Sequence, residues 1–385
     1  MQIITDTRTL AEFSRALRAH PFVAIDTEFM RERTYWPILC LIQAAAEGAE
    51  AVIDPMAAGI DLAPLLDVLA DPNVVKVFHA ARQDMEIFHQ LMDATPVPIF
   101  DSQIAAMACG YGDQIGYEPL MRGLLGAAID KGSRFTDWSR RPLSQAQLTY
   151  ALSDVTHLRD AYPLLMERLK AEGREAWVRE EMAALADPAL YRASPEAAWT
   201  RLKLRGVRPN EIGILMKLAE WREREAQTRD VPRARVLKDD AIFELARLKP
   251  KTVAALSGAR SIPEGFERSR SGAAILDAIA AGAALKASEL PDYDREEVRG
   301  GAPPDVVELL KVLLKRQCEQ FDVAPKLIAS AADIDAIALD DEADVPALHG
   351  WRREVFGELA LKLKRGEIAL TLKDGAVDFV ETAQK

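Results

Sequence analysis

Two acidic side chains stand close together in the stretch FVAIDTEFMRER, residues 22–33. Four apolar residues predict a buried strand leading into Asp26. Glu28 follows at the spacing that puts both carboxylates on one side of the strand, with Thr27 opposite. Like charges this close repel and are costly to bury, so the arrangement favours a cation between them. The alternative is a strand that ends in water, where acids are common.

Two further acids could join this pair. Asp84, in HAARQDMEIF, falls in the first turn of a predicted helix, where the alternative is a carboxylate that only stabilises the helix N-terminus. Asp154, in YALSDVTHL, lies one helical turn after Tyr150, so the two side chains share a helix face. The alternative there is a core tyrosine with an aspartate at its edge. Each signal alone is weak, but their order and spacing together are specific.

The segments that carry these residues alternate strand and helix signals over about the first 165 residues. Apolar runs at 22–29, 39–45 and 50–56 are separated by short turns and predict antiparallel neighbours. A fourth strand is predicted at 73–80, before the helix of Asp84. A long amphipathic helix is predicted at 144–173 with Ser144 as its N-cap. This pattern predicts a mixed α/β layered domain.

The rest of the chain is predicted to be helical. We expect an α/β domain at 1–173, a helical connector at 174–206, and helical modules at 207–286 and 305–385. Residues 287–304, rich in Pro, Gly and charge, are expected to form a linker between them. In both modules an apolar helix is followed by DVP or DVAP and another helix, which suggests a duplicated module.

The charge is unevenly distributed along the chain. The formal net charge is -11, but segment 201–251 holds 14 Lys and Arg against 8 Asp and Glu. Segment 331–349 has six acids and no Lys or Arg. A basic face on an acidic protein is therefore possible. The three cysteines form no CxxC motif, which argues against a disulfide framework or a zinc site. We find no signal peptide or membrane span and expect a cytoplasmic protein.

The three acidic motifs resemble those of a known superfamily. AIDTEF, FHAARQDMEIF and YALSDVTHL look like the motifs of the DEDD superfamily of 3′–5′ exonucleases, and the tyrosine before the last aspartate is typical of its tyrosine subclass. The longer stretch FVAIDTEFMRERTYWPILCLIQ is similar to the ribonuclease D family. The helical remainder resembles a pair of HRDC domains, which often bind nucleic acid. The resemblance implies a ribonuclease H-like mixed-sheet exonuclease domain followed by two all-α HRDC domains.

This resemblance also implies a reaction. It makes four carboxylates the ligands of two divalent cations, Mg²⁺ or Mn²⁺: Asp26, Glu28, Asp84 and Asp154. Asp26 would bridge both ions, Glu28 and Asp154 would hold the one that activates water, and Asp84 would support the second. Tyr150, with an unperturbed pKa of about 10, is a poor base, so it would orient the water and contact the scissile phosphate. Nucleoside 5′-monophosphates would be released one at a time from a 3′ end.

Side chains around the motifs are predicted to contact the substrate. These residues are Phe29, Met30, Arg31, His79, Arg82, Arg134, Trp138 and Arg141. For Phe29 and His79 the alternative is core packing, and for the arginines it is solvated surface charge. The family usually has Ser or Thr at the position of Gly132 and Arg or Gln at that of Phe135, so Arg134 is the local cation instead.

The leading interpretation is a 3′–5′ exoribonuclease that trims tRNA precursors and other small structured RNAs with single-stranded 3′ ends. A DNA 3′–5′ exonuclease is less favoured because the chain has no helicase P-loop and no polymerase-sized remainder. A silent RNA-binding adaptor is less favoured because all four acids and Tyr150 are present. No membrane partner is expected, and a monomer is favoured.

The two helical modules are expected to differ in their use. In the first, six basic residues are candidates for phosphate contacts, with ion pairs to neighbouring acids as the alternative: Arg222, Arg224, Arg229, Arg233, Arg235 and Lys238. The second module carries the acidic stretch 331–349, so we expect it to be architectural.

Overall fold

A six-stranded mixed sheet forms the centre of the part of the chain that carries the acids, and its order is β1-β4-β3-β2-β5-β6. The strands are β1 (Ile3–Ile4), β2 (Phe22–Met30), β3 (Ile38–Ala46), β4 (Ala49–Ile53), β5 (Val75–Phe78) and β6 (Ile99–Asp101). β3 pairs antiparallel with β4, as predicted, whereas β5 runs parallel to both β2 and β6. The carboxyl ends of the adjacent strands β2, β5 and β6 therefore lie next to one another, at the same end of the sheet.

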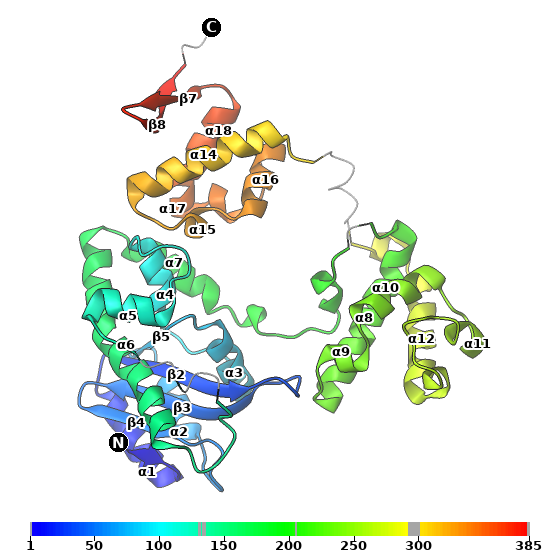
Figure 1. Cartoon of the computed structure of the whole chain (residues 1–385), viewed down its shortest axis with the longest axis horizontal. Helices are drawn as coiled ribbons and strands as arrows, with labels where there is room; N and C mark the ends of the chain where they lie inside the picture. The colour runs from blue at the N-terminus through cyan, green and yellow to red at the C-terminus, as the bar shows by residue number, and fades with distance from the viewer. Residues whose placement is uncertain (1, 130–131, 133–135, 205, 292–300, 383–385) are drawn as a thin grey trace. The chain divides into compact units, whose positions relative to one another are not determined.

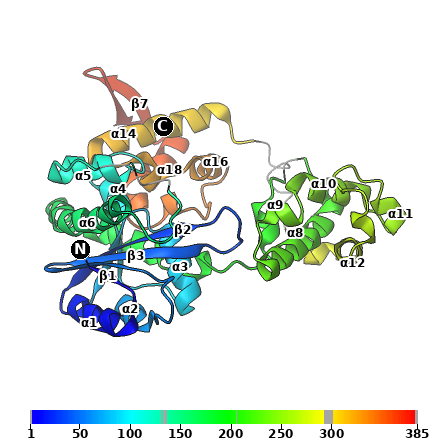
Figure 2. The same ribbon diagram turned by 60° about the horizontal axis from the view of Figure 1, so that its bottom comes forward.

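Helices cover both faces of this sheet, with α1 and α2 on one side and α4, α5 and α6 on the other (Figure 2). Their bounds are α1 (Thr7–Arg18), α2 (Ala63–Leu69), α3 (Arg82–Met92), α4 (Ser102–Ala108), α5 (Tyr117–Leu125), α6 (Gln145–Ala171) and α7 (Glu175–Leu185). Ser144 caps α6 in a reciprocal pair with Gln147, which confirms the predicted N-cap. Leu148, Ala151 and Val155 are buried on one face of α6, which turns that face toward the core.

The computed structural model describes the chain except for residues 1, 130–131, 133–135, 205, 292–300 and 383–385 (Figure 1). Its contacts define two units, the first with residues 1–28, 39–190 and 299–385, and the second with 29–38 and 191–298. This differs from the linear order predicted from the sequence, because the segment 29–38 groups with the first helical module and the second module groups with the α/β domain. No helix within the described ranges is long and apolar enough to cross a membrane.

The second unit is built on two helices in close contact. Its helices are α8 (Pro209–Arg229), α9 (Arg233–Val236), α10 (Asp239–Leu248), α11 (Val253–Leu256) and α12 (Arg270–Ala284). α8 crosses α12 where two glycines face each other. A Cβ added to Gly213 would lie 2.4 Å from the carbonyl oxygen of Gly282, and a Cβ added to Gly282 would lie 2.4 Å from the carbonyl oxygen of Gly213. Only glycine therefore lets the two backbones approach this closely.

The second helical module has the same succession of elements. It contains α14 (Pro304–Phe321), α15 (Pro325–Ile328), α16 (Ala331–Leu339), α17 (Gly350–Arg352) and α18 (Glu358–Lys364). The long helices α8 and α14 both end at an aspartate in the left-handed region, Asp230 with φ 48° and Asp322 with φ 47°, and a four-residue helix follows each. The module then ends in a hairpin that the sequence analysis did not predict, β7 (Ile368–Lys373) with β8 (Ala376–Glu381).

Within the first unit, the second helical module packs against α4 and α7. The backbone N–H of Ala324 donates to the carbonyl of Met107 at 3.0 Å. Arg174 donates to the carbonyls of Ala108 in the α/β domain and Phe321 at the end of α14. The rings of Trp177 and Trp351 stack with their centroids 4.3 Å apart and their planes 10° apart. These contacts hold the second helical module against the α/β domain, and its architectural role stays a prediction.

Within the second unit, the segment 29–38 is held by a buried polar network. Tyr35 is 4% exposed, and its hydroxyl donates to the carboxylate of Glu223, which is fully buried. Arg233 donates to the same carboxylate oxygen at 2.7 Å and lies over the Tyr35 ring at 4.7 Å. The backbone N–H groups of Tyr35 and Trp36 both donate to Asp230 at 3.0 Å. The loop that follows the strand of Asp26 is thus anchored in the first helical module.

We predict that Tyr35→Phe loosens this anchor. The change leaves the buried Glu223 with one donor fewer, which should cost about 1–2 kcal/mol and speed amide exchange in residues 29–38 about 5- to 30-fold. Hydrogen–deuterium exchange on the whole chain measures this. In a double-mutant cycle with Glu223→Ala, the two changes should couple, because each removes the same bond. Additive effects would contradict the assignment.

Candidate active site

Three of the four predicted acids converge at the carboxyl end of β2. Asp26 and Glu28 on β2 and Asp154 on α6 each offer a carboxylate oxygen, and these oxygens lie within 4.8 Å of one another. Alternation along the strand points Asp26 and Glu28 the same way, and the buried face of α6 brings Asp154 to them. A set of carboxylate oxygens at this separation fits a hard divalent cation such as Mg²⁺ or Mn²⁺.

The fourth acid, Asp84, lies beside this cluster rather than within it. It occupies the first turn of α3, directly after β5, and is 7% exposed. The hydroxyl of Thr27 donates to its Oδ1 at 2.5 Å. Thr27, between Asp26 and Glu28, served in the sequence analysis only to set their spacing. The structure shows that it connects the central strand to the fourth acid.

Two of these carboxyls, Asp26 and Asp84, have raised pKa values. Burial raises the pKa of Asp26 from 3.8 to about 6. The pKa of Asp84 is raised well above its ordinary value by burial and by the nearby Asp26. The pKa of Tyr150 is also raised, by burial and then by Asp154 and Glu28. Tyr150 is therefore protonated at neutral pH and can donate a hydrogen bond, but it cannot serve as a base.

Asp101, which the sequence analysis missed, fixes the turn that leads into Asp84. Ala80 in this turn has φ 56°, a strained value for a residue with a side chain. The carboxylate of Asp101 accepts from the backbone N–H groups of Ala80 at 3.0 Å and Ala81 at 2.8 Å. It also caps α4 by accepting from Gln103 at 2.8 Å. In the sequence, Asp101 stands between a predicted strand and a predicted helix. This position suggests a helix cap, but it does not indicate the bonds from Ala80 and Ala81.

Tyr117 is a second residue that no motif indicated. Its hydroxyl donates to the backbone carbonyl of Asp154. Its ring meets His79 edge-on, with the centroids 5.3 Å apart. His79 Nδ1 lies 2.9 Å from the Ser102 hydroxyl, and burial lowers the pKa of His79. This geometry favours a packing role for His79 behind the acids; its predicted contact with substrate stays a prediction.

The other predicted substrate-binding residues are dispersed. Phe29 and Met30 continue β2 beyond Glu28 and are half-buried, as is Arg31. Arg82 is exposed at the start of α3, two positions before Asp84. These four remain candidates for contacts with the substrate. Arg134 lies outside the described residues.

Arg141 and Trp138 have structural tasks that the sequence did not reveal. Arg141 binds both carboxylate oxygens of Asp54 at 2.7 Å and donates to the carbonyls of Cys40 and Trp138, also at 2.7 Å. The indole of Trp138 is 2% exposed, and its centroid lies 6.2 Å from that of Tyr150. The structure thus favours Arg141 as a clamp on the segment before α6 and Trp138 as packing for Tyr150, rather than either as a contact with RNA.

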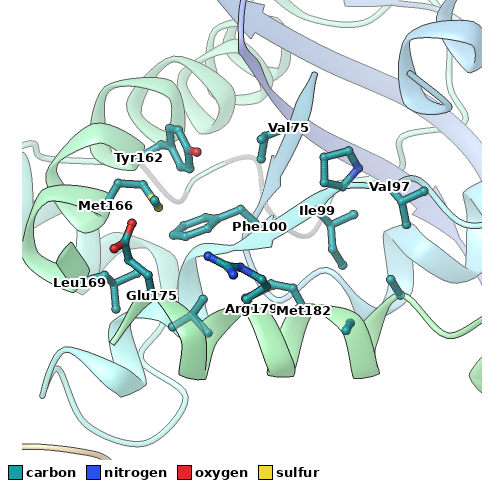
Figure 3. A pocket seen from close by; sticks show the side chains of 14 residues that line it. Val75, Val97, Ile99, Phe100, Tyr162, Met166, Leu169, Glu175, Arg179 and Met182 are labelled. Atoms are coloured by element: carbon teal, nitrogen blue, oxygen red, sulfur yellow. The ribbon is translucent and has the colours of Figure 1, made fainter. Parts of the chain in front are cut away.

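A pocket of about 350 Å³ between β6, α6 and α7 contains none of the four acids (Figure 3). Its lining is mostly apolar and includes Phe100, Tyr162 and Met166. It reaches Val75 and Ile99, the first residues of β5 and β6, whereas the acids lie at the carboxyl ends of β2 and β5. Since ligands of α/β sheets bind at the carboxyl ends of parallel strands, we do not assign the reaction to this pocket.

Comparisons with known proteins agree with the geometry. Residues 1–170 match a family model described as 3′-5′ exonuclease, and residues 211–279 match one described as HRDC domain. A mixed sheet with converging acids, followed by a helical module of this kind, defines a 3′–5′ exonuclease with an HRDC domain. The predicted α/β exonuclease domain followed by a helical HRDC domain is confirmed.

Relatives along the whole chain specify the family. Ribonuclease D of Granulibacter bethesdensis is 50% identical over 381 residues, which is 99% of this chain and 96% of the relative. Ribonuclease D of Nitrobacter hamburgensis is 49% identical and covers 99% of this chain and 100% of its own. The crystal structure of Escherichia coli RNase D, described as an exoribonuclease involved in structured RNA processing, matches with 29% identity and a TM-score of 0.81, over 94% of this chain and 98% of its own. The chain belongs to the ribonuclease D family and is a 3′–5′ exoribonuclease.

We predict that Thr27→Val impairs catalysis by releasing Asp84. Valine has nearly the same shape but cannot donate the hydrogen bond to Oδ1, and loss of a group that orients a metal ligand typically costs 10- to 100-fold. Turnover of a labelled RNA at saturating metal measures this. Thr27→Ser keeps the hydroxyl and is the matched control; it should stay near wild type. Equal rates for all three proteins would exclude the role.

We also predict a pH dependence in the metal-free protein. Because the folded pKa of Asp26 is raised from 3.8 to about 6, its contribution to stability is fully present below about pH 4 and is lost as the pH rises through about 6. A divalent cation replaces the proton and should remove this loss. Melting temperatures in EDTA and in Mn²⁺, compared between wild type and Asp26→Asn, measure it. A metal-induced rise of equal size in the variant would contradict the assignment.

Proposed function

We propose that this exoribonuclease hydrolyses RNA from the 3′ end by a two-metal mechanism and releases nucleoside 5′-monophosphates. The observation that carries the proposal is the convergence of Asp26, Glu28 and Asp154 on one point at the end of β2. Hydrolysis would break the bond between the terminal phosphate and the 3′ oxygen of the preceding nucleotide. The shortened RNA would then keep a 3′-hydroxyl for the next cycle.

The chain's own residues have distinct tasks in this proposal. Asp26 would touch both cations, Glu28 and Asp154 would hold one, and Asp84 the other. Two bound divalent cations would lower the pKa of the attacking water and stabilise charge on the phosphate oxygens. Tyr150, kept protonated by burial and by Asp154, donates a hydrogen bond that orients the water or a phosphate oxygen. Thr27 and Asp101 fix Asp84 so that its carboxylate does not turn away.

The proposed substrates are RNAs with single-stranded 3′ ends, with tRNA precursors among them, processed in the cytoplasm by a monomer. Support comes from the E. coli relative, whose structure is described in terms of structured RNA processing. A single-stranded 3′ end also suits the site better than a paired one. A paired terminal nucleotide would have to unpair and unstack before its phosphate could enter the acid cluster.

Two variants and two substrates test the proposal. Asp26→Asn should lower turnover of a 5′-labelled RNA by about a thousandfold or more, since losing a ligand shared by two cations removes several kcal/mol of transition-state stabilisation. Tyr150→Phe should lower turnover less, by about 10- to 100-fold, because the metal ligands remain. Asp160→Asn, an exposed acid on α6, is the control and should retain activity.

The labelled RNA and a matching DNA are incubated with Mg²⁺, Mn²⁺ or EDTA. Stepwise shortening of the RNA only with metal, and 5′-monophosphate products by chromatography, support the proposal. Near-normal turnover by Asp26→Asn would falsify the assigned role of that residue. Shortening in EDTA would exclude the two-metal mechanism.

A further inference from the structure

The apolar pocket between β6, α6 and α7, which lies away from the four acids, has the size and lining of a small-molecule site (Figure 3). Its volume of about 350 Å³ falls at the lower end of the range of known ligand sites, about 300–1,000 Å³. The lining is mainly aliphatic and aromatic, with Phe100, Met166 and Met182 among its side chains. Sites of this kind bind the apolar body of a ligand and use a few polar groups to orient it. The polar groups of this pocket therefore indicate the chemistry of its ligand.

Hydrogen bonds from residues behind the lining hold two walls of the pocket in place. Lys76, whose side chain is fully buried, donates to the carbonyls of Asp71 at 2.8 Å and Val97 at 2.5 Å. The hydroxyl of Thr95 donates to the carbonyl of Ala186 at 2.6 Å. Val97 and Ala186 both line the pocket. Because these bonds fix the backbone at both places, the shape of the pocket is set before a ligand binds.

Two side chains of opposite charge line the pocket from one face of α7. Glu175 and Arg179 are four residues apart, which places their Cβ atoms about 5–6 Å from each other. Within the described ranges of the chain, neither side chain makes a hydrogen bond or an ion pair. The other two acids of α7, Glu180 and Glu181, both pair with Arg352. The acid and the cation that face the pocket are thus free to bind a ligand.

A third polar group of the pocket, the hydroxyl of Tyr162, also has no partner in the part of the chain that the structure describes. The ring of Tyr162 packs against those of Phe22 and Phe100, with centroids 4.5 and 4.8 Å away. Burial raises the pKa of Tyr162. A tyrosine hydroxyl that is largely removed from water usually has a hydrogen-bond partner. Figure 3 shows Tyr162 across the pocket from α7, so the pocket offers a donor on the side opposite the two charges.

We propose that this pocket binds a free α-amino acid with a large apolar side chain, such as phenylalanine or leucine. The ammonium group pairs with Glu175, the carboxylate pairs with Arg179, and the apolar side chain lies against Phe100 and Met182. An α-amino acid carries both charges on one carbon atom, so two side chains one helical turn apart can bind them together. A singly charged ligand would leave one charge of the pocket unpaired beside an apolar body, which is costly. The proposal goes beyond the proposed function and does not depend on it.

Isothermal titration calorimetry on the whole chain tests the proposal with four probes, in EDTA so that no amino acid chelates a cation at the acid cluster. L-phenylalanine should bind with a Kd of about 0.1–1 mM, as expected for a ligand of about a dozen non-hydrogen atoms. 2-Phenylethylamine lacks the carboxylate and 3-phenylpropionate lacks the ammonium group, so each should bind about 10-fold more weakly. Glycine lacks the apolar side chain and should bind at least about 10-fold more weakly.

Two charge variants assign the groups that bind the ligand. Arg179→Gln should bind phenylalanine no more tightly than 2-phenylethylamine, because the carboxylate has lost its partner. Glu175→Gln should bind phenylalanine no more tightly than 3-phenylpropionate, because the ammonium group has lost its partner. Lys170→Gln removes an exposed cation of α6 that does not line the pocket, and this matched control should keep the wild-type Kd. Equal melting temperatures confirm that the variants fold.

Three results would overturn the proposal. Wild-type affinity for phenylalanine in both charge variants would place the ligand elsewhere on the chain. Tighter binding of 3-phenylpropionate than of phenylalanine would make the occupant an amphipathic anion. Absence of binding up to about 10 mM phenylalanine would exclude an amino-acid site. None of these measurements involves RNA cleavage, so a failure of the proposed function would leave their outcome unchanged.

Discussion

The mutual repulsion of the carboxylates is the constraint on which the rest of the nuclease domain depends. Asp26, Glu28 and Asp154 are held with their oxygens within 4.8 Å, and Asp84 stands beside them in a buried position. Nothing in their own chemistry keeps them there before a cation binds. The scaffold must therefore resist the repulsion. It does so with β2 near the centre of the sheet, with α6 packed against β4 and β5, and with α3, which follows β5. Thr27, Asp101 and Tyr117 complete this support.

The periodic parts of the site could be predicted from the sequence, and the long-range parts could not. Alternation along a strand placed Asp26 and Glu28 together, and the helical repeat placed Tyr150 one turn before Asp154. The bonds that fix Asp84 join residues 20 or more positions apart, as in Thr27 to Asp84 and Asp101 to Ala81. In the sequence, Thr27 and Asp101 are common residue types, and nothing in a motif indicates that they bond to a distant residue. Arg141 shows the opposite error, since its position beside a motif predicted a contact with a substrate phosphate. In the structure its partner is the carboxylate of Asp54, which an arginine binds equally well.

Local sequence patterns also could not predict that the segment 29–38 groups with the second unit. From sequence it is a connection between two neighbouring strands, and its aromatic residues gave no indication of where they would be buried. In the structure Tyr35 belongs to the core of the second unit, together with Ala226 and Val236. Burial raises the pKa of Glu223, but the bonds from Arg233 and Tyr35 outweigh this and hold it below its ordinary value, so the anchor is an ionised network rather than a neutral one. The chain thus passes between the two units at both ends of this loop.

The aspartates that end α8 and α14 occupy the same position in the two helical modules but have different partners. A left-handed residue at the end of a helix is the position where glycine is ordinarily the easiest choice. Here Asp230 accepts from the N–H groups of Tyr35 and Trp36, and Asp322 accepts from Arg168 and Arg174. Both modules therefore use the residue at the end of the long helix as a hydrogen-bond acceptor, each toward a different set of donors. If the two modules were exchanged, each aspartate would keep its place at the end of a helix and lose its donors. The modules are therefore alike in their succession of elements but not interchangeable.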